Sequence, residues 1–310
     1  MKKLLKCEIC SGKRFKFLFK QTDKNFDIPG EFSLYKCEDC GIIFINPQPT
    51  GKELQSYYPK ETYYSFNKVV TKEESRKEKL KIFLYDLYFN PGNKKYLQKI
   101  FFSPILPYLR GTSIMPGKKL LDFGCGSGQF LYEMAELGMK PHGVDPGDID
   151  RENLRKFNIK NNLKEAKYPK EHFDLITMNQ VLPHLNNPSR TLYELNRVLK
   201  KKGIFILGIP NSRSLAQRFF KKDWYQLDVP RHLFNFSDKI LIRLLRKNGF
   251  KIIKIRFSSR TDQFVNSFYY KMNFKKGGKI YGLLKVLSIP LVMAVNLLKT
   301  GDQIEIWCSK

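Results

Sequence analysis

Leu120-Leu121-Asp122-Phe123-Gly124-Cys125-Gly126-Ser127-Gly128-Gln129-Phe130 is the stretch that decides the fold of this chain. An apolar run ends at Asp122, and Gly124, Gly126 and Gly128 follow at every second position. This order predicts a strand that stops at a glycine turn and opens into a helix, where backbone can approach a nucleoside closely. Asp145 ends the next apolar run 23 residues after Asp122, about where such folds place the carboxylate that binds ribose hydroxyls.

Strand and helix patterns alternate along the chain from residue 118 onward. The apolar runs predict strands over 119–123, 141–144, 173–178, 204–207, 251–257 and 303–307. The helical spacing between them predicts helices over 129–137, 188–199 and 237–247. This alternation predicts an α/β fold built on a doubly wound sheet.

Four of the six cysteines form two Cys-x-x-Cys pairs near the N-terminus, separated by 26 residues. They are Cys7, Cys10, Cys37 and Cys40. Thiolates at this spacing form two knuckles around one tetrahedral Zn²⁺ ion, which leaves no open coordination position. The pattern therefore predicts a structural zinc ribbon. We expect the other two cysteines, Cys125 and Cys308, to be small buried residues.

The charge balance is strongly basic: 56 Lys and Arg residues against 29 Asp and Glu residues give a formal charge of +27. The span 239–285 holds 13 basic residues and a single acidic residue, Asp262. A proteome rich in lysine explains part of this excess. The density of basic residues in the span 239–285 suggests an anionic partner: a membrane surface, a phosphorylated substrate or nucleic acid. The first residues lack the apolar core of a secretion signal, so we expect a cytoplasmic protein, peripheral at the inner face of the membrane if the basic span binds lipid.

The composition shifts predict three segments. Residues 1–50 form the zinc ribbon, 51–115 a helical linker that caps the cofactor pocket, and 116–310 the main domain with a helical insertion at about 261–300. Within that insertion, 280–298 carries one charge and one proline. We expect a core-packed helix pair there; the alternatives are a helix lying on a membrane and a membrane span.

The opening stretch resembles the first motif of class I S-adenosylmethionine-dependent methyltransferases. Residues 173–184 resemble the fourth-strand motif of that family, with Pro183 where many members have Glu before the histidine. Residues 195–211 resemble its helix, turn and fifth strand, with Lys200–Gly203 in place of the usual Lys-Pro-Gly-Gly. Residues 230–237 resemble a bacterial branch that carries an N-terminal Cys-x-x-Cys ribbon and often acts in surface-polysaccharide or secondary-metabolite pathways.

This resemblance implies a Rossmann-like, doubly wound seven-stranded sheet whose last strand is antiparallel, together with the small zinc ribbon. It implies S-adenosylmethionine as cofactor, in addition to structural Zn²⁺. The cofactor-binding residues that it implies are Asp122, Gly124, Gly126, Gly128, Asp145 and Asn179. An NAD-binding turn is the alternative, but its G-x-G-x-x-G spacing differs from the G-x-G-x-G found here.

Methyl transfer is an in-line displacement at a sulfonium carbon, so the protein mainly aligns a nucleophile, and a hydroxyl acceptor also needs a base. His184 follows the fourth strand, at the edge of the sheet where substrates bind, and His232 lies in a later loop. We expect one of these two histidines to be the base. Arg231 and Tyr225 are the predicted substrate-binding residues; an arginine at this place would clamp a phosphate or a carboxylate.

The leading hypothesis is methyl transfer to a small-molecule or glycan-precursor acceptor, on oxygen or on carbon. The second hypothesis is an RNA methyltransferase, but the Asn179-Gln180-Val181-Leu182 stretch lacks the Asn-Pro-Pro-aromatic pattern of enzymes that methylate base amino groups. The third is a non-catalytic protein that binds the cofactor or docks on a membrane. The expected partners are a small or sugar-linked acceptor and an anionic membrane bound through 239–298; the oligomeric state stays open.

Overall fold

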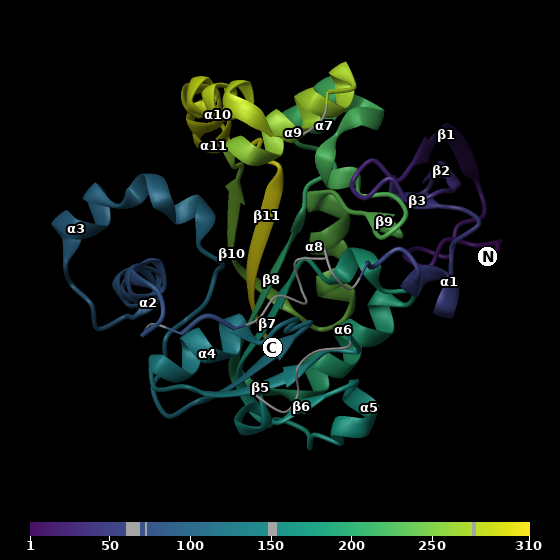
Figure 1. The fold of residues 1–310 in the computed structure, drawn as a ribbon. Coiled ribbons are helices and arrows are strands. Elements are labelled where there is room, and N and C mark those ends of the chain that lie inside the picture. The colour runs from purple at the N-terminus through teal and green to yellow at the C-terminus, as the bar shows by residue number, and fades with distance from the viewer. Residues whose placement is uncertain (60–68, 72, 148–153, 275–276) are drawn as a thin grey trace.

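The computed structural model describes residues 1–59, 69–71, 73–147, 154–274 and 277–310. These residues form a large mixed sheet covered by helices on both faces and a small antiparallel sheet beside it (Figure 1). In spatial order the large sheet contains β10 (Lys251–Ser258), β11 (Gln303–Ser309), β8 (Leu199–Pro210), β7 (Phe173–Asn179), β4 (Lys119–Phe123), β5 (Lys140–Val144) and β6 (Ile159–Lys160). The small sheet contains β1 (Phe15–Thr22), β2 (Glu31–Cys37), β3 (Ile43–Ile45) and β9 (Phe234–Asn235).

Helices connect and cover these strands. The α-helices in the described part of the chain are α1 (Gly51–Gln55), α2 (Arg76–Phe89), α3 (Tyr96–Phe101), α4 (Gln129–Glu136), α5 (Leu163–Ala166), α6 (Pro188–Val198), α7 (Leu215–Phe220), α8 (Asp238–Lys247), α9 (Thr261–Met272), α10 (Gly278–Leu287) and α11 (Ile289–Leu297). Short 3₁₀ turns follow several of them: η2 (Ser103–Tyr108), η3 (Arg155–Phe157), η4 (Leu182–His184), η5 (Lys221–Asp223) and η6 (Tyr225–Leu227).

The large sheet has the predicted topology. β4 pairs in parallel with both β5 and β7, and β7 pairs in parallel with β8. The last strand, β11, runs antiparallel to both of its neighbours, β8 and β10. The predicted seven-stranded, doubly wound sheet with an antiparallel last strand is therefore confirmed. The parallel strands bring their carboxyl ends to one edge, where folds of this kind bind their ligands.

Alternation along the strands gives the large sheet two apolar faces. Leu120 packs on one face with residues of α2 and α4, whereas Leu121 packs on the opposite face with residues of α6 and α8. Figure 1 shows α2 and α4 on one side of the sheet and α6 and α8 on the other. The sequence of α8 explains its packing, since Ser237 caps its first turn and its apolar residues at 240, 241, 244 and 245 share one buried stripe.

The small sheet combines segments far apart in the sequence. β1, β2 and β3 come from the cysteine-containing N-terminal segment, and β9 adds to their edge through the pairs Ile43 with Asn235 and Phe44 with Phe234. Phe44 and Phe234 are buried, and they belong to the same apolar cluster as residues of the large sheet. The N-terminal segment is thus joined to the region that follows the fifth parallel strand.

The helix pair α10 and α11 corrects one expectation. A core-packed pair was expected over 280–298, but α10 has no buried residue and α11 buries only Val292 and Val295. Apolar composition does not reveal whether another element covers a helix, which is why the sequence was misleading here. No single helix of the described residues is long and apolar enough to span a bilayer; α10 and α11 reach that composition only together, with a 41° bend between them.

Candidate functional site

The glycine turn between β4 and α4 has the backbone shape that the sequence predicts. Gly124, Gly126 and Gly128 have φ angles of +81°, +50° and +81°, a region that favours glycine. A Cβ atom on Gly124 would overlap the side chain of Val181, and one on Gly128 would lie 2.9 Å from a methyl group of Leu154. The Gly124 N–H donates to the Val144 carbonyl oxygen at 2.7 Å, which fixes the turn against the end of β5.

Asp145 lies directly beside this turn. One oxygen of its carboxylate accepts a hydrogen bond from the Gly126 N–H, and the other accepts one from the Gly147 N–H, both at 2.8 Å. The carboxylate therefore organises the glycine turn and the start of the next loop from the end of β5. This position, at the end of β5 and beside the turn, is the one at which the sequence predicts a carboxylate that contacts a ribose diol.

Asp122 is fully buried and bonds to protein groups. Arg110 forms a two-pronged ion pair with its carboxylate, and the Thr177 hydroxyl donates to it at 2.8 Å. The guanidinium of Arg110 also lies 3.9 Å above the centre of the Phe130 ring. Arg110 is a site residue that the sequence did not reveal, because it lies in an irregular loop without a motif. In this structure the carboxylate of Asp122 thus holds Arg110 and Thr177.

A cavity of about 330 Å³ lies at the edge of the large sheet, and Arg110, the partner of Asp122, lines it. The edge of the large sheet at β7, β8, β10 and β11 forms its floor. Residues from 107–110 and from 225–232 line its other sides. Asn179, Tyr225 and His232 line it, so three of the residues predicted from the sequence meet at one cavity. Its size is at the lower end of the range for small-molecule sites.

An ion pair that the sequence did not reveal lies in the floor of the cavity. Arg256 of β10 pairs with Glu305 of β11 at 2.8 Å, and Glu305 also accepts a hydrogen bond from the Gly111 N–H at 2.5 Å. Burial raises the pKa of Glu305 above its ordinary value, although Arg256 opposes this. Arg256 and Glu305 are far apart in the sequence and meet only because β10 pairs with β11. The sequence alone therefore could not identify this pair.

His232 is buried in the wall of the cavity with its tautomer fixed by the backbone. Its Nδ1 lies 2.8 Å from the Gln226 carbonyl oxygen, so Nδ1 must carry a proton and donate it. In the neutral ring, Nε2 then carries the lone pair, and a carboxylate oxygen of Asp228 lies 4.0 Å from it. Burial lowers the pKa of His232, while Asp228 opposes this effect, and the imidazole is neutral near pH 7.

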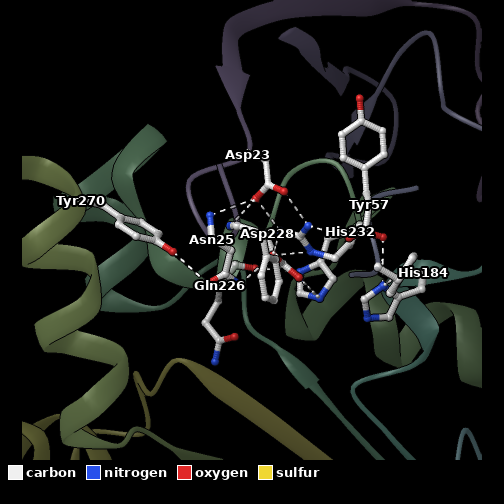
Figure 2. A network of polar contacts seen from close by, with 11 residues as sticks. Asp23, Asn25, Tyr57, His184, Gln226, Asp228, His232 and Tyr270 are labelled. Atoms are coloured by element: carbon white, nitrogen blue, oxygen red, sulfur yellow. Dashed lines mark hydrogen bonds and ion pairs between the residues drawn. The ribbon is translucent and has the colours of Figure 1, made fainter. Parts of the chain in front are cut away.

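His184 lies behind His232, with the two rings 4.7 Å apart (Figure 2). Its Nδ1 contacts the Arg231 carbonyl oxygen at 3.0 Å and the Tyr58 hydroxyl at 2.9 Å. Burial, with the nearby His232 as the next cause, lowers the pKa of His184 to about 3. His184 is not among the residues that line the cavity. Of the two histidines, His232 therefore lines the cavity, and His184 lies against it as a supporting residue.

Arg231 is predicted to bind a phosphate or carboxylate of the substrate, but in this structure its guanidinium bonds to groups of the protein. Its guanidinium is fully buried and bonds to both carboxylate oxygens of Asp23 at 2.7 Å and to Asp228 at 2.7 and 3.0 Å (Figure 2). It also donates to the Tyr57 carbonyl oxygen at 3.0 Å. Burial alone would raise the pKa of Asp228, but His232 and Arg231 outweigh this and lower it, so the carboxylate stays ionised. Arg231 thus links the N-terminal segment to the loop that carries His232.

The four N-terminal cysteines converge as the spacing predicts. Their sulfur atoms all lie within 4.8 Å of one another, with Cys7 Sγ 3.7 Å from Cys40 Sγ and Cys10 Sγ 3.6 Å from Cys37 Sγ. Four thiolates about 2.3 Å from one tetrahedral zinc ion lie about 3.8 Å apart, so the set fits this metal. The two knuckles are alike, since Ser11 and Gly41 both have positive φ angles and donate back to the carbonyl oxygens of Cys7 and Cys37.

A glycine turn at the carboxyl end of a parallel strand and a cavity at the same edge of the sheet are features of α/β proteins that bind nucleotide or nucleoside cofactors. Residues 94–255, just over half of the chain, match the family described as "Methyltransferase domain". The chain belongs to this family and is an S-adenosylmethionine-dependent methyltransferase.

Several curated relatives are named as methyltransferases. The chain is 27% identical over 206 residues to the ubiquinone biosynthesis O-methyltransferase of Pelagibacter ubique (57% of this chain, 84% of that protein). It is 25% identical over 176 residues to the enzyme of that name from Maricaulis maris (50% of this chain, 69% of that protein). A solved methyltransferase from Archaeoglobus fulgidus is 22% identical, with a TM-score of 0.44 over 74% of this chain and 99% of that one.

The glycine turn gives a first prediction. We expect Gly124→Ala to weaken S-adenosylmethionine binding about ten- to a hundredfold in titration calorimetry, because strain of about 1–3 kcal/mol would shift the turn. Gly117→Ala is the matched control, since Gly117 has a φ angle of +77° with open space around it. The control should lose stability but keep its affinity. Equal affinity in both variants would contradict a role of the turn in cofactor binding.

The buried ion cluster gives a second prediction. Asp23→Asn leaves the guanidinium of Arg231 with one carboxylate in place of two, so we expect the free energy of unfolding to fall by about 3–5 kcal/mol in urea titrations. Glu31→Gln breaks the exposed ion pair between Lys20 and Glu31 and should change stability little. Similar stability of the two variants would show that the cluster does not hold the fold together.

Proposed function

We propose that this enzyme methylates a hydroxyl group of a small, polyhydroxylated acceptor, such as a sugar-linked precursor. The observation that carries the proposal is the neutral His232, with its Nε2 lone pair, in the wall of the cavity. A hydroxyl needs to lose its proton as it attacks, and a neutral imidazole is suited to accept that proton near pH 7. Methylation on carbon is the alternative, and for that reaction the same histidine would accept the proton from carbon.

The side chains that line the cavity favour a polar acceptor. Amide-bearing residues are unusually frequent among them: Asn25, Asn179, Gln180, Gln226, Gln263 and Gln303. Amides both donate and accept hydrogen bonds, as hydroxyl groups do. The arginines of the lining have carboxylate partners, with Arg110 next to Asp122, Arg256 next to Glu305 and Arg260 next to Asp262. This balance of charge suits a neutral polyol better than a multiply charged ligand.

The cofactor would lie along the glycine turn. S-adenosylmethionine supplies an electrophilic methyl group on a sulfonium, which is a good leaving group. Asp145 would bind the ribose hydroxyls, and the glycines of the turn would let the backbone approach the cofactor. Arg110, held by Asp122, and Asn179 of the cavity lining would bind its amino acid end. The protein then supplies alignment and a site with little water.

The surrounding residues prepare His232 for its role. The Gln226 carbonyl oxygen keeps the proton on Nδ1, so Nε2 is the atom that accepts the acceptor's proton. Asp228 then stabilises the imidazolium that results, and Arg231 holds Asp228 in place. His184 packs against the ring of His232 and restricts its orientation.

We infer that the cysteine cluster holds a structural zinc ion. Four thiolates would fill the tetrahedral shell of this ion, so the metal would have no position for a substrate. The strands beside the cluster carry Asp23 into contact with Arg231, and the zinc ribbon would thereby support the loop of His232.

Replacement of His232 tests the proposed chemistry. Methyl transfer is measured as S-adenosylhomocysteine release with a panel of hydroxylated small molecules and sugar nucleotides. We expect His232→Asn to lower kcat about 10²- to 10⁴-fold without a change in cofactor affinity. His184→Asn, outside the cavity lining, should cost less. Full turnover by His232→Asn would contradict the proposal.

The pH profile follows from the direction of the pKa shift. Burial lowers the pKa of His232, so the base stays neutral below the ordinary histidine value of about 6.5. We therefore expect kcat/KM to remain near its maximum as the pH falls to about 6.5 and to decline only at more acidic pH. A decline that begins above pH 7 would indicate a base with a raised pKa and would contradict the assignment.

Metal removal tests the zinc ribbon. We expect elemental analysis to find one zinc ion per chain, and Cys10→Ser to lower both the zinc content and the melting temperature, because metal binding contributes directly to folding. Cys308→Ser is the control, since Cys308 is a buried cysteine outside the cluster. Metal-free protein with an unchanged melting temperature would contradict a structural zinc ion.

A further inference from the structure

The helices α10 and α11 form the largest group of exposed apolar side chains in the described chain. We call this surface the apolar hairpin, although its two helices are bent relative to one another by only 41°. The exposed residues of the hairpin are Ile280, Leu283, Val286, Leu287, Ile289, Leu291, Met293, Leu297 and Leu298. Leu283 is 58% exposed, Leu287 64% and Leu297 81%. Contiguous apolar surface of this kind marks an interaction site in a folded protein.

The hairpin is attached to the body of the protein at both ends. At its start, the Tyr281 hydroxyl donates to Asn266 of α9 at 2.9 Å. At its end, Asn296 donates to the Ser259 carbonyl oxygen at 3.2 Å and accepts from the Ser259 N–H. Helices of 10 and 9 residues are about 15 Å long or less, too short to cross a hydrocarbon core of about 30 Å. Neither helix can therefore cross a bilayer alone, and only the two together, with a bend of 41°, reach the length and composition of a span.

The sequence that contains these helices is rich in basic residues. Residues 263–301 contain six lysines and no acidic residue. Lys279 and Lys299 are exposed, and Lys285 lies over the ring of Tyr281, whose centre is 5.8 Å from its nitrogen. Lysines next to exposed apolar helices complement a lipid bilayer, whose interior is apolar and whose headgroups are anionic. A second copy of this chain fits less well, because a symmetric contact would bring the lysines of both copies together.

We propose that the apolar hairpin docks this enzyme on the surface of a bilayer that contains anionic lipids. The apolar side chains enter the boundary between headgroups and acyl chains, and the lysines contact lipid phosphates. Figure 1 places α10 and α11 beyond one end of β10 and β11, away from α5 and α6. The surface is independent of the proposed chemistry, so the enzyme would bind lipid whatever its acceptor is.

Vesicle flotation of the full-length protein tests this proposal, with vesicles of phosphatidylcholine alone and of phosphatidylcholine mixed with phosphatidylglycerol. We expect binding to the anionic vesicles, and Leu283→Glu should weaken it at least about tenfold. Tyr193→Glu is the matched control, because Tyr193 of α6 is 63% exposed on a different part of the surface. Lys279→Gln should weaken binding several-fold and Lys164→Gln, in α5, should not.

Three results would overturn the proposal. The first is wild-type protein that stays unbound with anionic vesicles. The second is equal vesicle binding by Leu283→Glu and Tyr193→Glu, with melting temperatures that show both variants folded. The third is a dimer, detected by sedimentation, that Leu283→Glu disrupts while neither protein binds vesicles, which would assign the hairpin to a second copy.

Discussion

The buried guanidinium of Arg231 is the interaction on which the functional architecture depends. It bonds to Asp23, 208 positions earlier in the sequence, and to Asp228 in its own loop. A buried charge is tolerated only when its partners remain in place, so this cluster keeps the N-terminal segment and the 225–232 loop in one arrangement. The same arrangement places Asp228 beside His232 at the cavity wall. Through Asp23, the segment that follows β1 thus contributes to the position of the loop that carries the proposed base.

The two halves of the site are built by different means. The cofactor side depends on backbone conformation, with positive φ angles at Gly124 and Gly128 and a carboxylate that accepts backbone N–H groups. The proposed acceptor side depends on side chains brought together from the ends of β7, β8, β10 and β11, from the start of α9 and from the loops around them. Local sequence determines the first half, whereas tertiary structure determines the second.

This difference explains how much could be predicted from the sequence. The alternation of strands and helices follows from local patterns and the seven-stranded sheet from the family resemblance, and the structure confirmed this sheet. The structure also places Asp145 beside the glycine turn and brings the four cysteines together. Arg110 and the pair of Arg256 with Glu305 could not be found, because loop packing and strand pairing alone bring them to the site. The prediction that α10 and α11 pack in the core was wrong, because a core helix and an exposed apolar helix can have the same composition.

The most direct test of the site is a crystal structure of the full chain with S-adenosylhomocysteine. We predict that the nucleoside lies along the turn at Gly124–Gly128, that Asp145 accepts hydrogen bonds from both ribose hydroxyls, and that the sulfur faces the cavity on the side of His232. A nucleoside bound away from the glycine turn, or a sulfur that faces away from the cavity, would contradict the assignment of the cofactor site and of the base.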